Sequence, residues 1–356
     1  HSDHRRQRQM CIRDRMGDVA EFYVDNEVRN HYFVSISGYH IAEAGANPIS
    51  QAALTLSNGL TYVELFNSRG LDANKFLRNF SWFFSNGMDP EYAVIGRVCR
   101  RIWAIAMRDM YGVDERGQKL KYHIQSSGRS LHAQEYTWND YRTTLQALYA
   151  LADNANSLHT NSRDEAFGTP TEDTVRDAVA IQLILSKEYG WLQNENPLQG
   201  SHVADWLTDS VEEEILKIFE EMHRRGGVLG ALEVNYQRNR IQDESMIYEH
   251  RKHSGELPII GVNTFEEGVD NSLSVEEFDI EVTRSDKEER MMVIDRNKVF
   301  KETHAKEAEE GLARLKQVAR EGGNLFEVMM DIVEHCTVGQ VTQALFETGG
   351  KFRRNM

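Results

Sequence analysis

The sequence predicts an α/β protein, namely the second half of a (β/α)8 TIM barrel (four βα units) followed by a helical C-terminal extension. From Met16 onward, short apolar segments with strand character alternate with longer helical segments, in units of roughly 35 to 45 residues. Four such units are present, whereas a closed parallel barrel needs eight. An open half-barrel exposes two strand edges, so we expect the chain to be a fragment that lacks the first four strands.

The expected strands are rich in β-branched and aromatic residues. They cover 33–37, 80–84, 120–125 and 156–160. Gly38 follows the first strand, and we expect it to let the backbone turn before the rings of Tyr39 and His40.

Helix signals follow the strands. Thr169 and Glu172 make a capping-box pattern with Pro170 at the first helical position, and Gly190 is the expected stop. The apolar face expected on this helix comprises Val175, Ala178, Val179 and Leu183. A second helix is expected from about Thr208 to the glycines at 226 and 227.

Composition divides the chain into four regions. We expect a disordered or non-native, arginine-rich leader over 1–15, a partial (β/α)8 barrel over 16–265, an acidic linker over 266–296 and a helical extension over 297–356. Within the extension, the pattern predicts helices over 297–320 and 325–335, and a last helix that Thr337 opens.

Charge and cysteine content exclude several classes of protein. The formal charge is -15 and the pI is near 5.4, which argues against nucleic-acid binding and against a basic membrane-surface protein. Cys11, Cys99 and Cys336 lack CxxC spacing, so they indicate neither a disulfide framework nor a structural zinc site. The sequence has no apolar run of about 18 residues and no secretory h-region. We therefore expect a cytoplasmic location.

Polar side chains gather where each expected strand ends, and the active site of a parallel barrel lies at that end. They are Tyr39 and His40, then Ser81 and Asn86, then His123 and Gln125, then His159, Asn161, Asp164 and Glu165. This repeated placement predicts a pocket of neutral hydrogen-bond donors and acceptors.

The residue types alone leave the chemistry of this pocket open. His40, His123 and His159 could form a metal site with Glu165, but HxH and HxxxH spacings are absent, so we predict no metal. Ser81 could belong to a nucleophilic triad, although no GxSxG motif surrounds it. Neither GxGxxG nor a P-loop is present.

Six stretches, in this order and spacing, resemble the substrate-binding barrel of adenosylcobalamin-dependent acyl-CoA mutases across nearly all of 16–265. They are SISGYHIAEAGA, FSWFFSNGMDPEY, KYHIQSSGRSLHAQ, NSLHTNSRDEA, NPLQGS and PIIGVN. Within this methylmalonyl-CoA mutase large-subunit family, SNGMDPEY, SGRSLHAQ and LFETGGKFRRNM favour the fused isobutyryl-CoA mutase branch.

The resemblance implies a barrel that encloses an acyl-CoA and is capped by a separate cobalamin domain. It implies a radical rearrangement that interconverts isobutyryl-CoA and n-butyryl-CoA, in which the cofactor supplies the difficult step. His40 would hydrogen-bond the thioester carbonyl and Tyr39 would shape the pocket. The implied substrate and CoA contacts are Asn79, Ser81, His123 and Gln125, and the implied adenosyl contacts are Gln125, Gly128, Asn156, Asn161 and Glu165.

The chain also departs from the family pattern. Asn79 stands where methylmalonyl-CoA mutases have a CoA-contacting arginine, and Arg163 replaces a residue that is usually uncharged. Neither the cobalamin-binding DxHxxG motif nor a GTPase P-loop is in the sequence. We therefore expect a cobalamin-binding domain and a GTPase chaperone domain outside this chain, an inactive isolated chain, and a homodimer when the protein is complete.

Three alternatives remain. The first is a methylmalonyl-CoA mutase or related acyl-CoA mutase, because the substrate-distinguishing strands are expected upstream. The second is a non-catalytic subunit that needs a partner chain. The third is a cofactor-free hydrolase that uses His40 with Glu165.

Overall fold

The computed structural model describes residues 15–29, 31–266 and 284–350, which fall into two compact units. One unit comprises 34–64 and 77–283 and contains the sheet. The other comprises 1–33, 65–76 and 284–356. The predicted leader, apart from Arg15, and positions 267–283 of the predicted linker lie outside the described residues.

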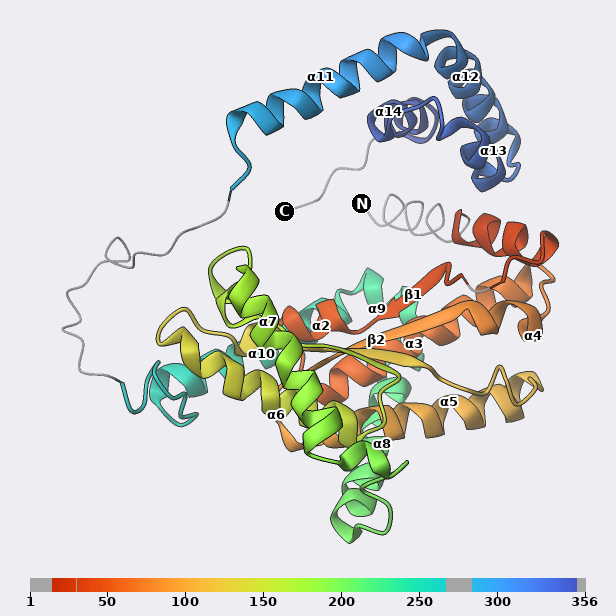
Figure 1. Ribbon diagram of the computed structural model, residues 1–356. Helices are drawn as coiled ribbons and strands as arrows, with labels where there is room; N and C mark the ends of the chain where they lie inside the picture. The colour runs from red at the N-terminus through yellow and green to blue at the C-terminus, as the bar shows by residue number, and fades with distance from the viewer. Residues whose placement is uncertain (1–14, 30, 267–283, 351–356) are drawn as a thin grey trace. The chain divides into compact units, whose positions relative to one another are not determined.

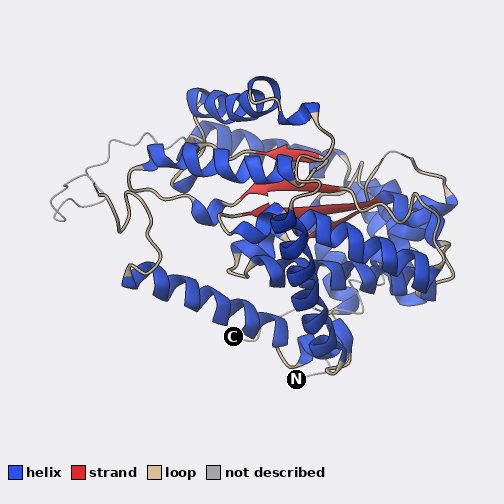
Figure 2. Cartoon of the chain, turned by 90° about the horizontal axis from the view of Figure 1, so that it is seen from below, coloured by secondary structure: helices blue, strands red, loops and turns tan. Residues whose placement is uncertain are grey.

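The sheet has four parallel strands in chain order, and Figure 2 shows them lying side by side. They are β1 (Val34–Ser37), β2 (Phe80–Asn86), β3 (Tyr122–Ser126) and β4 (Ser157–His159) (Figure 1). Each predicted strand is present, and the parallel α/β class is confirmed.

One face of the sheet is apolar and buried. Its side chains are Val34, Ile36, Phe80, Trp82, Phe84, Tyr122 and Ile124. Trp82 packs edge-on against Trp103 of α5 (Ile95–Tyr111), with ring centroids 4.8 Å apart. It also packs so closely on Gly59 of α3 (Pro48–Ser68) that a Cβ there would lie 2.2 Å from the indole. The core of this unit therefore lies between the strands and their helices.

The remaining helices of this unit surround the sheet or extend from it. They are α2 (Tyr39–Glu43), α6 (Asn139–Ala152), α7 (Glu172–Leu183), α8 (His202–His223), α9 (Gly227–Glu233) and α10 (Tyr236–Ser254). Gly190 has φ of 77° after the π-helical turn Ile184–Glu188, which confirms the predicted stop.

The start of α7 differs from the prediction. Thr171, not Thr169, is the N-cap, and it forms a capping box with Thr174. Asp164 explains this shift, because its Oδ2 accepts hydrogen bonds from the Thr171 amide at 3.0 Å and the Thr174 hydroxyl at 2.7 Å. Both bonds fix the first turn at that point.

The predicted apolar face of α7 is mostly exposed to solvent and not buried against the sheet. Ala178 is 5% exposed, but the other three members are between 46% and 51% exposed. Those three are Val175, Val179 and Leu183. The reason is that α7 follows the edge strand β4, and its buried side is instead made by Thr174, Ala178 and Ile181.

The next helix, α8, begins at His202, before the predicted Thr208. Ser201 caps it by accepting a hydrogen bond from the Ala204 amide at 3.3 Å. The predicted end is confirmed, since Gly226 has φ of 85° directly beyond the last turn.

The other unit is helical in its described part. It contains a helix over 15–25, α4 (Ala73–Phe76), α11 (Lys287–Thr303), α12 (Ala305–Glu321), α13 (Leu325–Ile332) and α14 (Val338–Gly349). Its core comprises Ala308, Leu315, Val328, Ile332, Cys336 and Ala344. The helix predicted from 297 begins at Lys287, where Asp286 and Glu289 form a capping box, and His304 interrupts it. Thr337 caps α14, as predicted.

Candidate active site

The second face of the sheet is polar and partly exposed. Ser35 of β1 pairs with Ser81 of β2. One row across the strands comprises Ser37, Phe83, His123 and Ser157, and the next comprises Ser85, Gln125 and His159. The serines at 35, 37 and 157 were not among the predicted site residues, although the alternation of apolar residues and serine in β1 was a signal for them.

Tyr39 lies over this polar face. Its ring stacks on Phe83, with centroids 4.9 Å apart and an angle of 7° between the planes. Burial, followed by the negative charges of Glu43 and Glu165, raises the pKa of Tyr39 to about 12. The phenol is therefore neutral near pH 7 and able to donate a hydrogen bond.

Gly38 has a different role from the one predicted. Its φ of -93° and ψ of -15° are open to any residue, so the turn itself does not require glycine. A Cβ here would instead lie 2.2 Å from Thr55 Oγ1 and 3.0 Å from Gln51 Cγ, both on α3. Glycine thus permits the close approach of β1 to α3.

Asn161 connects the ends of β3 and β4. The Asn161 Oδ1 accepts hydrogen bonds from Ser126 Oγ at 2.9 Å and from Gln125 Nε2 at 3.4 Å. The backbone amide of Asn161 donates to Ser126 Oγ at 2.9 Å. A Cβ on Gly128 would lie 3.6 Å from the Tyr39 hydroxyl and 3.8 Å from Asn161 Nδ2. The structure therefore brings Tyr39, Gln125, Gly128 and Asn161 together; we call these four residues the strand-end cluster.

Two histidines and one carboxylate lie beside this cluster. His123 Nδ1 is 2.8 Å from Ser157 Oγ. Partial burial, with a smaller effect of His159, lowers the pKa of His123, so its ring is neutral at pH 7. His159 Nε2 lies 3.9 Å from Glu165 Oε1, which places that carboxylate at the end of β4.

Asn79 and Asn156 both lie at the amino-terminal ends of their strands, away from the carboxyl ends where the strand-end cluster lies. Asn79 is buried in the 3-10 turn before β2. Asn156 precedes β4, and its Oδ1 accepts a hydrogen bond from the Tyr122 amide at 2.9 Å. The structure does not bring either residue to the strand-end cluster, although the sequence analysis grouped Asn156 with the adenosyl contacts.

His40 diverges from Tyr39. It lines a cavity of about 230 Å³ together with residues of α3, α8, α9 and α10, including Leu54, Met222, Leu232 and Gln237. Partial burial lowers the pKa of His40, so the imidazole is neutral at pH 7. Adjacent residues of a helix project about 100° apart, which accounts for the different surroundings of the two rings.

Arg163, which departs from the family pattern, is held by two carboxylates. Its guanidinium lies 2.7 Å from Asp140 Oδ2 and 2.5 Å from Asp177 Oδ2. These partners are on α6 and α7, so the arginine connects two helices.

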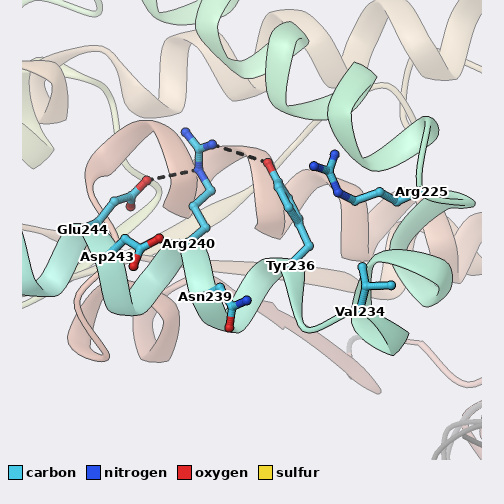
Figure 3. A pocket seen from close by; sticks show the side chains of 7 residues that line it. All are labelled: Arg225, Val234, Tyr236, Asn239, Arg240, Asp243 and Glu244. Atoms are coloured by element: carbon cyan, nitrogen blue, oxygen red, sulfur yellow. Dashed lines mark hydrogen bonds and ion pairs between the residues drawn. The ribbon is translucent and has the colours of Figure 1, made fainter.

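A larger cavity of about 460 Å³ lies at the start of α10, and Figure 3 shows its lining residues. Arg225 and Arg240 lie on either side of Tyr236 there (Figure 3). Arg240 is hydrogen-bonded to the Tyr236 hydroxyl at 3.4 Å and paired with Glu244 at 3.1 Å. The cavity contains none of the predicted site residues.

Metal binding and membrane insertion are two further possibilities for the described residues 15–29, 31–266 and 284–350. In that part of the chain, no group of three or more histidine, cysteine, aspartate and glutamate side chains is placed to hold a metal ion. None of its helices combines the length and apolarity needed to cross a membrane.

Comparison with known proteins gives consistent matches. A family model described as methylmalonyl-CoA mutase matches residues 8–351. The chain is 60% identical to a fused isobutyryl-CoA mutase of Nocardia farcinica, over 96% of this chain and 32% of that protein. It is also 60% identical to a fused isobutyryl-CoA mutase of Geobacillus kaustophilus, over 96% of this chain and 31% of that protein. Identity to the Escherichia coli methylmalonyl-CoA mutase is 32%, over 88% of this chain and 43% of that protein.

Proposed function

Because this chain belongs to the methylmalonyl-CoA mutase family, we propose that it is the acyl-CoA-binding part of an adenosylcobalamin-dependent mutase that interconverts isobutyryl-CoA and n-butyryl-CoA. The observation that carries this proposal is the 60% identity to fused isobutyryl-CoA mutases, against 32% to a methylmalonyl-CoA mutase. The chain spans about a third of the length of those fused relatives. The activity is therefore proposed for the full-length protein.

In this proposal the four strands are the second half of a (β/α) barrel, and the rest of the protein provides the first half. Two features support it. Strands β1 and β4 each have a single neighbour in the sheet, so each has a free edge for a further strand. Val175, Val179 and Leu183 of α7 expose apolar surface beside β4, and further βα units would cover it.

In this proposal, two of the predicted boundaries move, namely those of the barrel part and of the acidic linker. The barrel part begins at Val34 within the predicted 16–265, because residues 16–33 belong to the other compact unit, and the acidic linker ends at Asp286, the N-cap of α11. The cobalamin-binding domain and a GTPase chaperone domain would lie in the remaining two thirds of the protein. We further propose a homodimer in the cytoplasm.

The polar face of the sheet would bind the coenzyme A part of the substrate. The pantetheine arm is narrow and carries amide groups, which need hydrogen-bond partners when they leave water. Ser35 and Ser81 provide hydroxyl groups, and their small side chains leave room along the face. His123 and Gln125 continue this surface toward the strand-end cluster.

The strand-end cluster fits the adenosyl group by its chemistry. Asn161 and Gln125 offer amide groups, Glu165 offers a carboxylate suited to ribose hydroxyls, and Gly128 adds no side chain beside the Tyr39 hydroxyl. Asn161, Gln125 and Glu165 would hold the adenosyl group, and adenosylcobalamin would supply the radical chemistry of the rearrangement. The protein residues bind and orient the two molecules and keep water away from the reacting carbon atoms.

In our proposal, the acyl end of the substrate extends toward the cavity that His40 lines, where His40 donates a hydrogen bond to the thioester carbonyl and stabilises the charge that shifts onto its oxygen during migration. Its lowered pKa supports this role, because a neutral imidazole donates without adding a full charge. Tyr39, stacked on Phe83, covers one side of the site and excludes water.

The test is to purify the full-length protein, add adenosylcobalamin and isobutyryl-CoA, and quantify n-butyryl-CoA by chromatography. Parallel reactions contain methylmalonyl-CoA, or omit cobalamin. We expect butyryl-CoA only with cobalamin. Faster formation of succinyl-CoA from methylmalonyl-CoA would move the assignment to that mutase, and thioester cleavage without cobalamin would show a hydrolase.

A further inference from the structure

Three segments of the site meet at the carboxylate of Glu43. This residue ends α2, the short helix that carries Tyr39 and His40. Its Oε1 accepts hydrogen bonds from Ser85 Oγ and Ser127 Oγ, both at 2.9 Å. Its Oε2 accepts one from the Arg129 backbone amide at 2.9 Å. One side chain thus joins α2 to the end of β2 and to the turn after β3.

The helix α2 depends on such contacts. It has five residues and no side-chain cap at its start, and helices this short are unstable alone. At its amino end, the Gly38 amide donates to the Phe83 carbonyl at 2.7 Å, and Tyr39 stacks on the ring of the same residue. At its carboxyl end, the hydrogen bonds of Glu43 hold the helix. The position of α2 is therefore determined at both ends.

The same carboxylate also contacts the turn that faces Tyr39. A Cβ on Gly128 would lie 3.2 Å from Glu43 Oε2 and 3.6 Å from the Tyr39 hydroxyl. Arg129, the residue after Gly128, donates its backbone amide to Glu43, so the turn beside the Tyr39 hydroxyl is bonded to this carboxylate. Glu43 consequently determines the spacing between the phenol and this turn.

We propose that Glu43 is a positioning residue: its carboxylate fixes α2 on the ends of β2 and β3, and so fixes Tyr39 and His40 relative to Gln125, Gly128 and Asn161. This inference rests on the proposed function for its catalytic consequence. Its structural part, the fixing of α2, stands on the three hydrogen bonds of Glu43.

The central variant is Glu43→Gln in the full-length protein. The amide oxygen of glutamine can still accept from Ser85 and Ser127, but its NH2 group cannot accept from the Arg129 amide. Ser127→Ala is a second variant, which removes one hydrogen-bond donor to Glu43 without changing the sequence of α2. The matched control is Glu249→Gln, because the Glu249 carboxylate lies 3.4 Å from the Arg129 guanidinium and, within the described residues, forms no hydrogen bond or ion pair with α2.

Two measurements separate positioning from general destabilisation. We expect Glu43→Gln to lower kcat by about 100-fold with KM for the acyl-CoA within about twofold, since small misplacements of reacting groups have effects of this size. Hydrogen exchange should accelerate at least about tenfold at the α2 amides of Ile41 and Ala42, which bond to Gly38. Exchange at the Trp82 amide, inside the sheet, should not change. Ser127→Ala should show both effects at smaller size.

Normal kcat in Glu43→Gln, or an equal loss in Glu249→Gln, would overturn the catalytic part. Unchanged exchange in α2 would overturn the structural part. If Glu43→Gln does not fold, Ser127→Ala decides both parts by the same criteria. If the unaltered protein has no mutase activity, the proposed function fails, and hydrogen exchange still tests whether Glu43 fixes α2.

Discussion

The carboxylate of Asp153 accepts a hydrogen bond of 2.5 Å from the backbone amide of Gly96, at the start of α5. A second bond of 2.9 Å comes from the Arg97 amide, and Arg100 lies 3.5 Å from the same carboxylate. Asp153 follows α6 in the chain, so this buried group joins two helices that pack beside the sheet.

The substitution Asp153→Asn should destabilise the protein by about 2 kcal/mol, because the amide NH2 cannot accept one of the two backbone bonds and Arg100 loses its ion pair with this side chain. Urea unfolding at pH 7.5 measures the change. Asp109→Asn is the control, since that exposed aspartate contacts only the neighbouring Arg108 in the described hydrogen bonds. A loss no larger than the control's would contradict the role of Asp153.

The substitution Gly38→Ala should cost about 1 to 3 kcal/mol through overpacking against Thr55 and Gln51. Gly339→Ala, where no atom lies within 4 Å of the added Cβ, should leave stability unchanged or raise it. Thermal unfolding measures both variants. Adding Thr55→Ala to Gly38→Ala should recover part of the loss, and its failure to do so would argue against a clash at that hydroxyl.

Acid should destabilise the protein through His132. This residue is 8% exposed, and burial, followed by the charges of Lys252 and Arg142, lowers the pKa of His132 to about 4. The unfolded chain, with a histidine pKa near 6.5, binds more protons between pH 6.5 and 4. Stability therefore falls as the pH falls through that window, by on the order of 3 kcal/mol.

His132→Gln should remove this part of the pH dependence, and His250→Gln, at an exposed histidine, should retain it. Urea unfolding at pH 7 and pH 4.5 gives the comparison. Equal losses in the unaltered protein and in His132→Gln would assign the acid sensitivity to other groups.

For the proposed function, His40→Ala in the full-length protein should lower kcat by about 100-fold to 1000-fold, while KM for isobutyryl-CoA changes by less than about threefold. The reason is that the proposed hydrogen bond strengthens as charge moves onto the thioester oxygen. His253→Ala, at an exposed position of α10, is the control. Unchanged turnover in His40→Ala would exclude the assigned role.

Glu165→Gln should raise the KM for adenosylcobalamin by about tenfold and leave the KM for the acyl-CoA nearly unchanged, because a neutral amide binds ribose hydroxyls less well than a carboxylate. Steady-state kinetics with each component varied separately measures this. A change in the acyl-CoA constant alone would move Glu165 to the substrate side of the site.

Much of the fold could be predicted from the sequence because the strands have strong local signals. The β-branched and aromatic residues of β1 and β2 marked their positions, and the family motifs indicated the order of the units. Helix starts were harder to predict, because one threonine or serine decides them. Thr171 was preferred over Thr169 through its contact with Asp164, which the linear pattern does not show.

The candidate site was predictable in part, for a similar reason. Tyr39, Gln125, Gly128 and Asn161 meet because parallel strands end at the same edge of the sheet. The divergence of His40 from Tyr39 depends on which helices pack beside α2. The role of Glu43 depends on hydrogen bonds between segments more than 40 residues apart in the chain. Such relationships have no local sequence signal.

The serines on the polar face of the sheet affect the heat-capacity change expected when a ligand binds there. The hydroxyl groups of Ser35 and Ser81 lie on the accessible face of the sheet, where water is their hydrogen-bond partner in the absence of a ligand. Entry of a pantetheine arm would then exchange hydrogen-bonding water for amide groups and would bury little hydrocarbon. The heat-capacity change of that exchange is small, whereas apolar burial gives a strongly negative one. In the proposed complex, such a surface would release its ligand readily, because exchange of one polar partner for another changes the free energy little.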